Sequence, residues 1–223
     1  ANKLQSDFES IASHELKTPL ASIGAYAEAL YGHADVPEVP ERREFLGVIR
    51  HENDRLLRMV NRILDFSQVE FGNRNLNRRT MKLQDVLDDT LHALAPQSMA
   101  RHQRFEIDFP VEVPPVEIDP DLVKQVLVNL VGNAIKYGPD GGRIMIEGRE
   151  RATSVEVSVR DEGPGIPESE VENIFRQFYR VKHEGDDLPE GSGLGLTIVR
   201  NIIEMHGGRI EVDGGEGTGA TFR

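Results

Sequence analysis

A short polar run near the start of the chain carries side chains that could transfer a phosphoryl group. Residues 13–20 read SHELKTPL, which places His14 beside Glu15 and four residues before Thr18. A neutral imidazole nitrogen is a nucleophile that can attack a phosphorus atom. Glu15 could accept a hydrogen bond from the other ring N–H. Thr18 shares a helix face with His14 and could hold a water for the reverse, dephosphorylating reaction.

This run alone does not establish phosphoryl chemistry. The chain has seven histidines, and a lone histidine on a helix is more often an ordinary surface residue. A zinc site of the H-E-x-x-H kind is excluded, because residue 18 is threonine. Apolar residues recur at steps of three or four around the run, so His14 is predicted to face away from the apolar stripe, toward solvent.

A second group of polar residues lies in the segment 122–138, LVKQVLVNLVGNAIKYG. Asn129, Asn133 and Lys136 fall at i, i+4 and i+7, and so share one face of a helix while the apolar residues between them reach the core. Amide oxygens are suitable ligands for Mg²⁺, and a lysine supplies charge for phosphates. Tyr137 could pack against a base or sugar. The alternative is an amphipathic surface helix with two solvated asparagines.

Three glycine-rich runs follow, at 161–166 (DEGPGI), 191–196 (GSGLGL) and 217–222 (GTGATF). A carboxylate such as Asp161 at a strand end can accept a hydrogen bond from an exocyclic amine, which selects adenine. The second run opens a helix, whose N-terminal N–H groups bind anions. Glycine runs alone often mark turns. The spacing fits neither G-x-G-x-x-G nor G-x-x-x-x-G-K-[ST], and no H-R-D or D-F-G element is present.

Two stretches of the sequence resemble one protein family. Phe8 to Leu20 resembles the H-box of HisKA-type sensor histidine kinases, with Lys17 where many members have arginine. The later segments resemble, in order, the N, G1, F, G2 and G3 boxes of the histidine-kinase ATP-binding domain. Phe175 and Phe178, in IFRQFYR, correspond to the F box. The resemblance implies the Bergerat fold that GHKL ATPases share.

The resemblance also implies roles for individual residues. His14 would be phosphorylated, Glu15 would assist as acid or base, and Thr18 would serve phosphatase activity. Asn133, with Asn129 beside it, would bind Mg²⁺, and 181–192 would form the ATP lid. The expected ATP-binding residues are Asn129, Asn133, Lys136, Tyr137, Asp161, Gly163, Gly165, Ile166, Phe178, Arg180, Gly191, Gly193, Leu194, Gly195, Leu196 and Thr218.

The function expected from this resemblance is ATP-dependent autophosphorylation of His14. The phosphoryl group would pass to an aspartate of a response regulator, with phosphatase activity on that regulator. One alternative is a GHKL-type ATPase, but such enzymes carry a water-activating glutamate where this chain has Asn129, whose amide is no general base. The other is a pseudokinase scaffold, which would be expected to have lost one of the key residues, and all are present.

The predicted elements fall into two parts. Helices at 2–31 and 41–71, joined by GHADVPEVP, form a hairpin whose apolar stripes need a second copy, so we expect a homodimeric four-helix bundle. Pro19 should kink or loosen the first helix. After it come helices at 83–102, 120–137 and 194–206 and strands at 105–109, 143–150, 154–161, 209–213 and 220–222. The fold class is therefore multi-domain, with an α-helical hairpin followed by an α/β sandwich whose mixed sheet has helices on one side.

Domain limits and partners follow from this division. We expect a dimerisation and phosphotransfer hairpin at 1–72, a linker at 73–80 and an ATP-binding domain at 81–223. The formal net charge of −12 disfavours nucleic-acid binding, and the absence of cysteine excludes disulfides and thiolate chemistry. No apolar run reaches the ~20 residues of a membrane span. We expect a cytoplasmic location, whether or not the full-length protein is membrane-anchored, and a sensor domain upstream of this chain.

Overall fold

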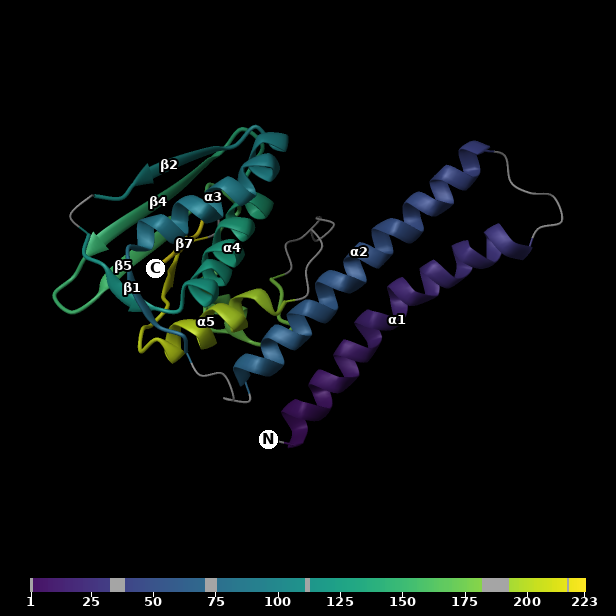
Figure 1. The fold of residues 1–223 in the computed structure, drawn as a ribbon, viewed down its shortest axis with the longest axis horizontal. Coiled ribbons are helices and arrows are strands. Elements are labelled where there is room, and N and C mark those ends of the chain that lie inside the picture. Colours follow the sequence, from purple (N-terminus) through teal and green to yellow (C-terminus); the bar gives the residue numbers. More distant parts are fainter. Residues whose placement is uncertain (1, 33–38, 71–75, 111–112, 182–192, 216) are drawn as a thin grey trace. The chain divides into compact units, whose positions relative to one another are not determined.

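The fold comes from a computed structural model that describes all residues except 1, 33–38, 71–75, 111–112, 182–192 and 216 (Figure 1). The side chains of residues 2–15, 32, 39, 58 and 61–70 also lie outside the description. The chain divides into two compact units, Ala1–Gln68 and Val69–Arg223. Among the described helices, none combines the length and apolar character needed to cross a membrane.

The first unit is a pair of long helices, α1 (Asn2–Gly32) and α2 (Val39–Glu70), which agree with the predicted hairpin. The rings of Tyr26 and Phe45 pack with their centroids 5.3 Å apart and so join the two helices. Pro19 lies inside α1, which continues through it as helix, and its side chain is fully buried. Leu20, the next residue, is 55% exposed within a single copy of the chain.

The second unit is built on a five-stranded mixed sheet. Its strands are β2 (Arg104–Asp108), β4 (Arg143–Glu150), β5 (Val155–Arg160), β6 (Val212–Asp213) and β7 (Thr221–Phe222). They lie in the order β2-β4-β5-β7-β6, in which only the β2–β4 pair is parallel. In β4, Ile144, Ile146 and Gly148 alternate inward, as expected for a sheet with one covered face.

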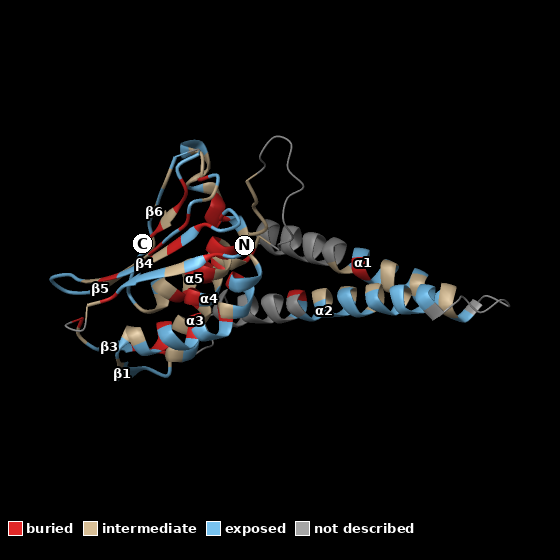
Figure 2. Ribbon diagram, turned by 90° about the horizontal axis from the view of Figure 1, so that it is seen from above, coloured by how far each residue is buried: buried red, intermediate tan, exposed pale blue. Residues whose placement is uncertain are grey.

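Three helices cover that inner face: α3 (Leu83–Ala100), α4 (Pro120–Tyr137) and α5 (Gly195–Met205) (Figures 1 and 2). Helix α4 is central, because it packs on both α3 and α5 as well as on the sheet. Asp119 caps its N-terminus, Pro120 occupies the first turn, and Lys136 lies in the last turn. The core lies between helices and sheet, and its fully buried side chains include Leu122, Val131, Ile144, Ile146, Ile198 and Ile202.

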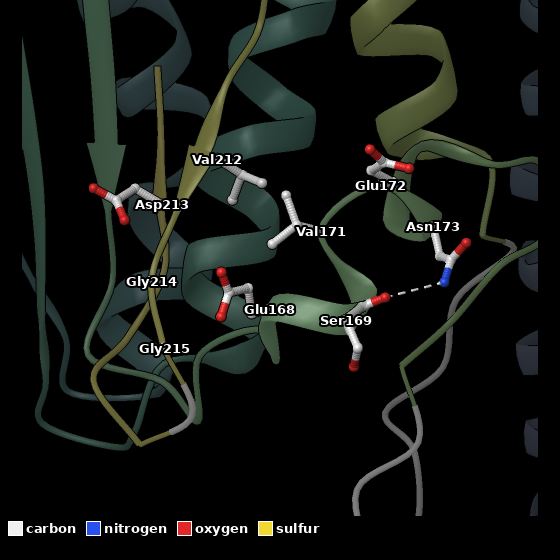
Figure 3. Close-up of a pocket in the computed structure, with 9 residues that line it drawn as sticks. All are labelled: Glu168, Ser169, Val171, Glu172, Asn173, Val212, Asp213, Gly214 and Gly215. Atoms are coloured by element: carbon white, nitrogen blue, oxygen red, sulfur yellow. Dashed lines mark hydrogen bonds between the residues drawn. The ribbon is translucent and has the colours of Figure 1, made fainter.

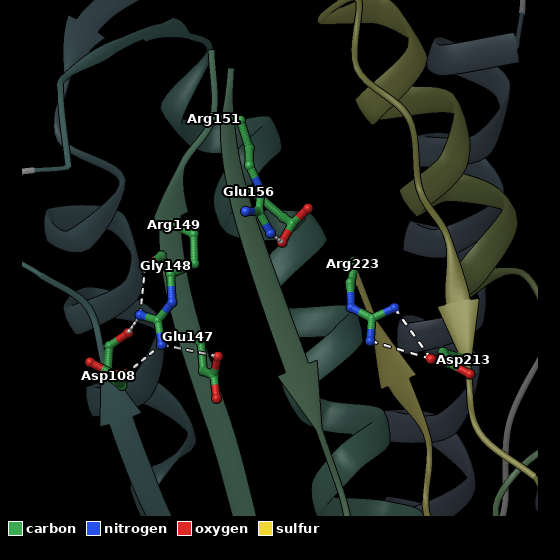
Figure 4. A network of polar contacts seen from close by, with 8 residues as sticks. All are labelled: Asp108, Glu147, Gly148, Arg149, Arg151, Glu156, Asp213 and Arg223. Atoms are coloured by element: carbon green, nitrogen blue, oxygen red, sulfur yellow. Dashed lines mark hydrogen bonds and ion pairs between the residues drawn. The ribbon is translucent and has the colours of Figure 1, made fainter. Parts of the chain in front are cut away.

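The outer face of the sheet is solvated and charged (Figure 4). Arg149 pairs with Asp108 at 2.6 Å and with Glu147 at 3.2 Å, and Arg151 pairs with Glu156 at 2.7 Å. Exposed pairs of this kind contribute little to stability, typically below about 1 kcal/mol each.

The structure confirms the predicted fold class of a helical N-terminal part followed by a mixed-sheet α/β domain. Sequence analysis missed a second, two-stranded sheet, in which β1 (Arg79–Met81) pairs antiparallel with β3 (Val116–Ile118). The first residues of β1 belong to the segment predicted as linker. Two further short helical turns, η1 (Glu168–Glu170) and η2 (Asn173–Phe175), follow β5.

Candidate nucleotide site and phosphoacceptor helix

The predicted phosphoacceptor residues lie in the middle of α1. His14 and Glu15 have helical backbone, and their side chains lie outside the described residues. Thr18 is described and exposed, one turn after His14 on the same helix. The orientation of His14 toward solvent stays a prediction.

Helix α4 presents the predicted polar face. Asn129, Asn133 and Lys136 are half-buried, whereas the apolar residues between them (Val126, Leu127, Leu130 and Ile135) are buried, as their spacing predicts. The Nδ2 atom of Asn129 donates to the carbonyl of Gln125 at 2.9 Å, which fixes the amide with its oxygen directed elsewhere. The side chain therefore offers an acceptor, which suits a cation or a backbone N–H.

The oxygen of Asn129 lies against the first turn of α5. A Cβ placed on Gly195 would come within 2.8 Å of Oδ1 of Asn129. Among the described residues, which exclude 182–192, no side chain caps this helix end, so its first N–H groups can serve an external acceptor. Only glycine permits this close approach, and it brings the polar face of α4 to a helix N-terminus of the kind that binds phosphates.

At the other end of α4, Lys136 and Tyr137 contact one another. The ammonium of Lys136 lies 3.1 Å from the Tyr137 hydroxyl and 4.6 Å from the centre of its ring. Tyr137 is 37% exposed. A phosphate would have to draw the Lys136 ammonium away from this exposed contact, which is a small cost for a cation–π pair at the surface.

Asp161 is a buried acid at the end of β5, close to α4. It is 6% exposed, and its Oδ1 accepts the N–H of Gly163 at 2.8 Å and that of Ala220 at 3.4 Å. Burial raises the pKa of Asp161 above its ordinary value, and the two backbone hydrogen bonds and the charge of Arg160 offset this only in part. Oδ2 has no hydrogen-bond partner among the described residues, so it is available to an external donor.

The glycines around Asp161 bring three segments together. A Cβ on Gly163 would lie 2.7 Å from the carbonyl oxygen of Tyr137, so this loop packs directly on the end of α4. Gly219 has φ +79°, and a Cβ there would collide with the carbonyl of Asp161. Gly165 is buried against Gly215, and Ile166 is half-buried beside it. The predicted adenine anchor thus lies where α4, the 161–166 loop and the last hairpin meet.

The segment resembling an F box is tied to the start of α5. Phe175 is buried, its carbonyl accepts from Thr197 Oγ1 at 3.0 Å, and Arg200 lies 4.0 Å above its ring. Phe178 has a positive φ of 60° and donates its N–H to the carbonyl of Gly193 at 3.0 Å. Arg180 and Leu196 are half-buried, and Leu194 is fully buried, so the Leu194 side chain belongs to the core.

For two of the predicted nucleotide contacts, Gly191 and Thr218, the described part of the chain shows no group positioned for the nucleotide. Gly191 and most of the predicted lid lie outside the described residues. The Thr218 hydroxyl is used within its own turn, because it donates to the carbonyl of Gly215 at 2.8 Å and accepts the Gly215 N–H at 2.9 Å. A nucleotide contact through this hydroxyl stays a prediction. Donation to a phosphate would replace its bond to the Gly215 carbonyl, whereas its second lone pair can still accept.

An open hollow of about 660 Å³ lies beside this region, between residues 168–173 and 212–215 (Figure 3). Its lining includes the carboxylate residues Glu168, Glu172 and Asp213 but none of the residues predicted to bind nucleotide. Carboxylates repel a polyphosphate, so electrostatics excludes this hollow as the triphosphate site. Among the described residues, no cluster of three or more His, Cys, Asp or Glu side chains could hold a metal ion.

Sequence reasoning missed the residues that hold α4 in place. Arg101 donates to the carbonyls of Ile135 and Lys136 at 2.6 and 2.7 Å, and Gln103 donates to that of Ile135 at 3.0 Å. Asp119 and His206 hold the opposite end. The Asp-Pro pair at 119–120 is a recognisable helix-start signal, whereas the partners of Arg101 and Gln103 are distant in sequence.

Comparison with known proteins assigns the two units to families. Residues 118–223 match the family of histidine kinase-, DNA gyrase B- and HSP90-like ATPases, and residues 4–72 match the His Kinase A (phospho-acceptor) domain. The combination of a phosphoacceptor helix and this type of nucleotide domain defines a class of two-component signalling enzymes. The chain belongs to the sensor histidine kinases.

Individual relatives support the same assignment. Sensor histidine kinase WalK of Bacillus subtilis is 35% identical over 219 residues, covering 97% of this chain and 35% of WalK. Histidine kinase ThkA, solved in complex with response regulator protein TrrA, has a TM-score of 0.77 and 29% identity, covering 99% of this chain and 60% of that one. Full-length ShkA in complex with AMPPNP has a TM-score of 0.73 and 26% identity over 96% of this chain and 44% of that one. The chain spans about a third or less of the length of the first curated relatives.

Proposed function

We propose that this chain autophosphorylates His14 with ATP and passes the phosphoryl group to an aspartate of a response regulator. The observation that carries the proposal is Asn129, whose amide is held by the Gln125 carbonyl with its oxygen toward the start of α5. An amide does not titrate, so this position cannot activate water for hydrolysis. A transferable phosphoryl group bound here would instead go to the imidazole that the first unit supplies.

The first of the two steps would be phosphoryl transfer from ATP to His14. A ring nitrogen of His14 donates its lone pair to the γ-phosphorus as the bond to the bridging oxygen breaks, and ADP leaves with that electron pair. Glu15 would accept the hydrogen bond of the other ring N–H and stabilise the developing positive charge. The Lys136 ammonium and the bidentate Arg180 guanidinium would bind the phosphates. The first N–H groups of α5 would bind them as well, since a helix N-terminus attracts anions.

The residues present fit a Mg²⁺ ion. The Asn129 oxygen is free of the Gln125 bond and lies at the helix end expected to hold phosphates, and Asn133 lies one turn further along the same face. Amide oxygens with water and phosphate oxygens make a suitable set for this ion. When bound, Mg²⁺ neutralises charge on the phosphate oxygens. Asp161 would select adenine by accepting its exocyclic amine at Oδ2.

The hairpin would act as a homodimer. Leu46 and Leu57 are 57% and 55% exposed in one copy, and Val60 is 41% exposed. Their spacing along α2 gathers them on one face. A second copy of the chain would bury this face in a four-helix bundle. The division into a hairpin at 1–72, a linker at 73–80 and an ATP-binding domain at 81–223 stays a prediction. A response regulator would dock on the hairpin near His14, as a partner of the kind found with ThkA.

The experiment is incubation with γ-labelled ATP and Mg²⁺. The label should be acid-labile and alkali-stable, as phosphohistidine is, and His14→Gln should abolish it while ATP binding persists. His51→Gln, at an exposed histidine of α2, is the matched control and should label normally. Wild-type labelling of His14→Gln would refute the proposal, and labelled free phosphate without labelled protein would favour an ATPase.

The same preparation tests the proposed phosphatase activity. Thr18→Ala removes an exposed hydroxyl and should leave α1 intact, because alanine has the higher helix propensity. It should retain autophosphorylation and lose most dephosphorylation of the regulator. Glu15→Gln should instead lower autophosphorylation. Equal loss of both activities in both variants would contradict this division of roles.

A further inference from the structure

Three parts of the second unit, namely residue 77, the start of α4 and the end of α5, meet at Asp119, the residue that precedes α4. Asp119 is 4% exposed, and its Oδ1 caps the helix by accepting the N–H of Leu122 at 3.3 Å. Its Oδ2 accepts the N–H of Asn77 at 3.0 Å, and its own N–H donates to Nε2 of His206 at 3.0 Å. Its carbonyl accepts the N–H of Val123 at 3.0 Å, so every polar group of this residue is bound by α4, by residue 77 or by His206.

The histidine in this arrangement ends α5. Because Nε2 of His206 accepts a backbone N–H, the proton of the neutral ring is on Nδ1, which lies 2.7 Å from the carbonyl of Ile202. Arg78 donates to the carbonyl of Met205 at 3.2 Å, which places a cation at the negative end of the α5 dipole. Residues 77 and 78 thus hold the start of α4 and the end of α5 together.

The same two helices touch again at the predicted nucleotide site. The start of α4 meets the end of α5 at Asp119 and His206, and further along α4 Asn129 meets the start of α5 at Gly195. Residues 119 and 129 are about 15 Å apart along a helix axis, and residues 195 and 206 about 16 Å. The two contacts therefore lie at opposite ends of one antiparallel helix pair. A shift of α5 along the axis of α4 at one contact would displace the other contact by the same amount.

We propose that Asp119 and His206 are positioning residues for the nucleotide site. They set the axial register of α5 against α4, and so the distance between the N-terminus of α5 and the Asn129 amide. The two helices pack closely at this point, because a Cβ on Gly195 would lie 2.8 Å from Oδ1 of Asn129. Through Asn77, the same point fixes the segment that leads into β1. The inference rests on the proposed nucleotide site and adds residues that touch no ligand.

The test compares variants that differ in one hydrogen-bonding group. His206→Leu removes the acceptor for the Asp119 N–H, whereas His206→Gln can present an amide oxygen in its place. Asn77→Pro removes the donor to Oδ2, whereas Asn77→Ala keeps it. His92→Leu is the matched surface control, since His92 also lies 3.1 Å from a carbonyl four residues earlier but is exposed on α3.

Two readouts are taken on the whole chain: the Kd for AMPPNP with Mg²⁺ by calorimetry, and the amide resonance of Gly195 in the nucleotide-free protein. His206→Leu and Asn77→Pro should each weaken binding by about 3- to 30-fold, as expected for one link of a packed network. Both should shift the Gly195 resonance. His206→Gln, Asn77→Ala and His92→Leu should stay near wild type, and the double variant His206→Leu with Asn77→Pro should be less than additive.

The outcomes separate the possible failures. Wild-type Kd and wild-type Gly195 resonance in folded His206→Leu, with only a lower melting temperature, would show that the pair is structural and overturn the proposal. If His206→Leu does not fold, the Kd for AMPPNP and the Gly195 resonance of Asn77→Pro test the proposal in the same way. A wild-type chain that binds no nucleotide would overturn the proposed function, and the Gly195 resonance would still decide whether His206 sets the register.

Discussion

Replacing Asp161 by asparagine separates the structural use of this side chain from its proposed use in adenine recognition. Both backbone N–H groups that reach the carboxylate bind Oδ1, from Gly163 and from Ala220. An asparagine can keep its own Oδ1 in that place and put its amide nitrogen where Oδ2 is now. The Asp161→Asn variant should therefore fold, and should meet adenine with a donor instead of an acceptor.

The expected size of the effect follows from the environment of Asp161. A hydrogen bond to a charged acceptor contributes about 1.5–3 kcal/mol, so its loss should weaken ATP binding roughly 10- to 150-fold. Burial of Asp161 argues against the low end, because water cannot readily replace the lost partner. Guanine should respond differently, because it presents a carbonyl oxygen where adenine presents an amine. The amide of Asp161→Asn can donate to that oxygen, so the preference for ATP over GTP should shrink or reverse.

The assay is calorimetric titration of wild type and variant with the Mg²⁺ complexes of ATP and GTP. Asp88→Asn, at an exposed carboxylate on α3, controls for the loss of one charge. Circular dichroism checks that the variant is folded. Unchanged ATP affinity in a folded Asp161→Asn would refute the assigned role, and an equal loss for both nucleotides would show that Asp161 shapes the loop without reading the base.

Three further predictions follow from the same geometry. Gly195→Ala should destabilise the second unit by about 1–3 kcal/mol despite the better helix propensity of alanine, because its Cβ meets Asn129, and adding Asn129→Ala should restore the melting temperature. Leu57→Asp should convert a dimer to a monomer in light scattering, because the dimer would bury an unpaired carboxylate; an unchanged mass would contradict the bundle. Burial raises the pKa of Asp161 in the folded chain, so ionised Asp161 disfavours the nucleotide-free fold. Denaturation curves should show wild type losing stability relative to Asp161→Asn as pH rises from about 4 through that raised pKa.

The long elements could be predicted from the sequence because their hydrophobic pattern extends over enough residues to be recognised. Helix α4 and strand β4 begin and end at the predicted residues, since a cap, a proline and a glycine mark the helix and a short apolar run at 144–146 between charged residues marks the strand. The strands β1 and β3 have three residues each, too few for a period to be visible. Their pairing depends on contacts between residues distant in the chain, which no local pattern records.

The sequence predicted which residues belong to the candidate site, but it did not predict which atom of each residue is already hydrogen-bonded. The motifs located Asp161, Asn129 and Thr218, but which atom of each is engaged depends on folded geometry. The structure commits Oδ1 of Asp161 to two backbone N–H groups and the Thr218 hydroxyl to its own turn, and leaves the Asn129 oxygen at the start of α5. These assignments follow from backbone approaches that glycines permit, and the glycine pattern alone does not say which atoms approach.

Helix α4 is held at both ends by partners from its own unit. Asp119 fixes its start to residue 77 and to α5, while Arg101 and Gln103 bind its last carbonyls, where a cation also suits the helix dipole. The residues on its polar face therefore keep their spacing with or without nucleotide. Affinity changes in variants of Asn129 or Asn133 should then report lost contacts to the nucleotide, because the helix itself does not have to reorganise on binding.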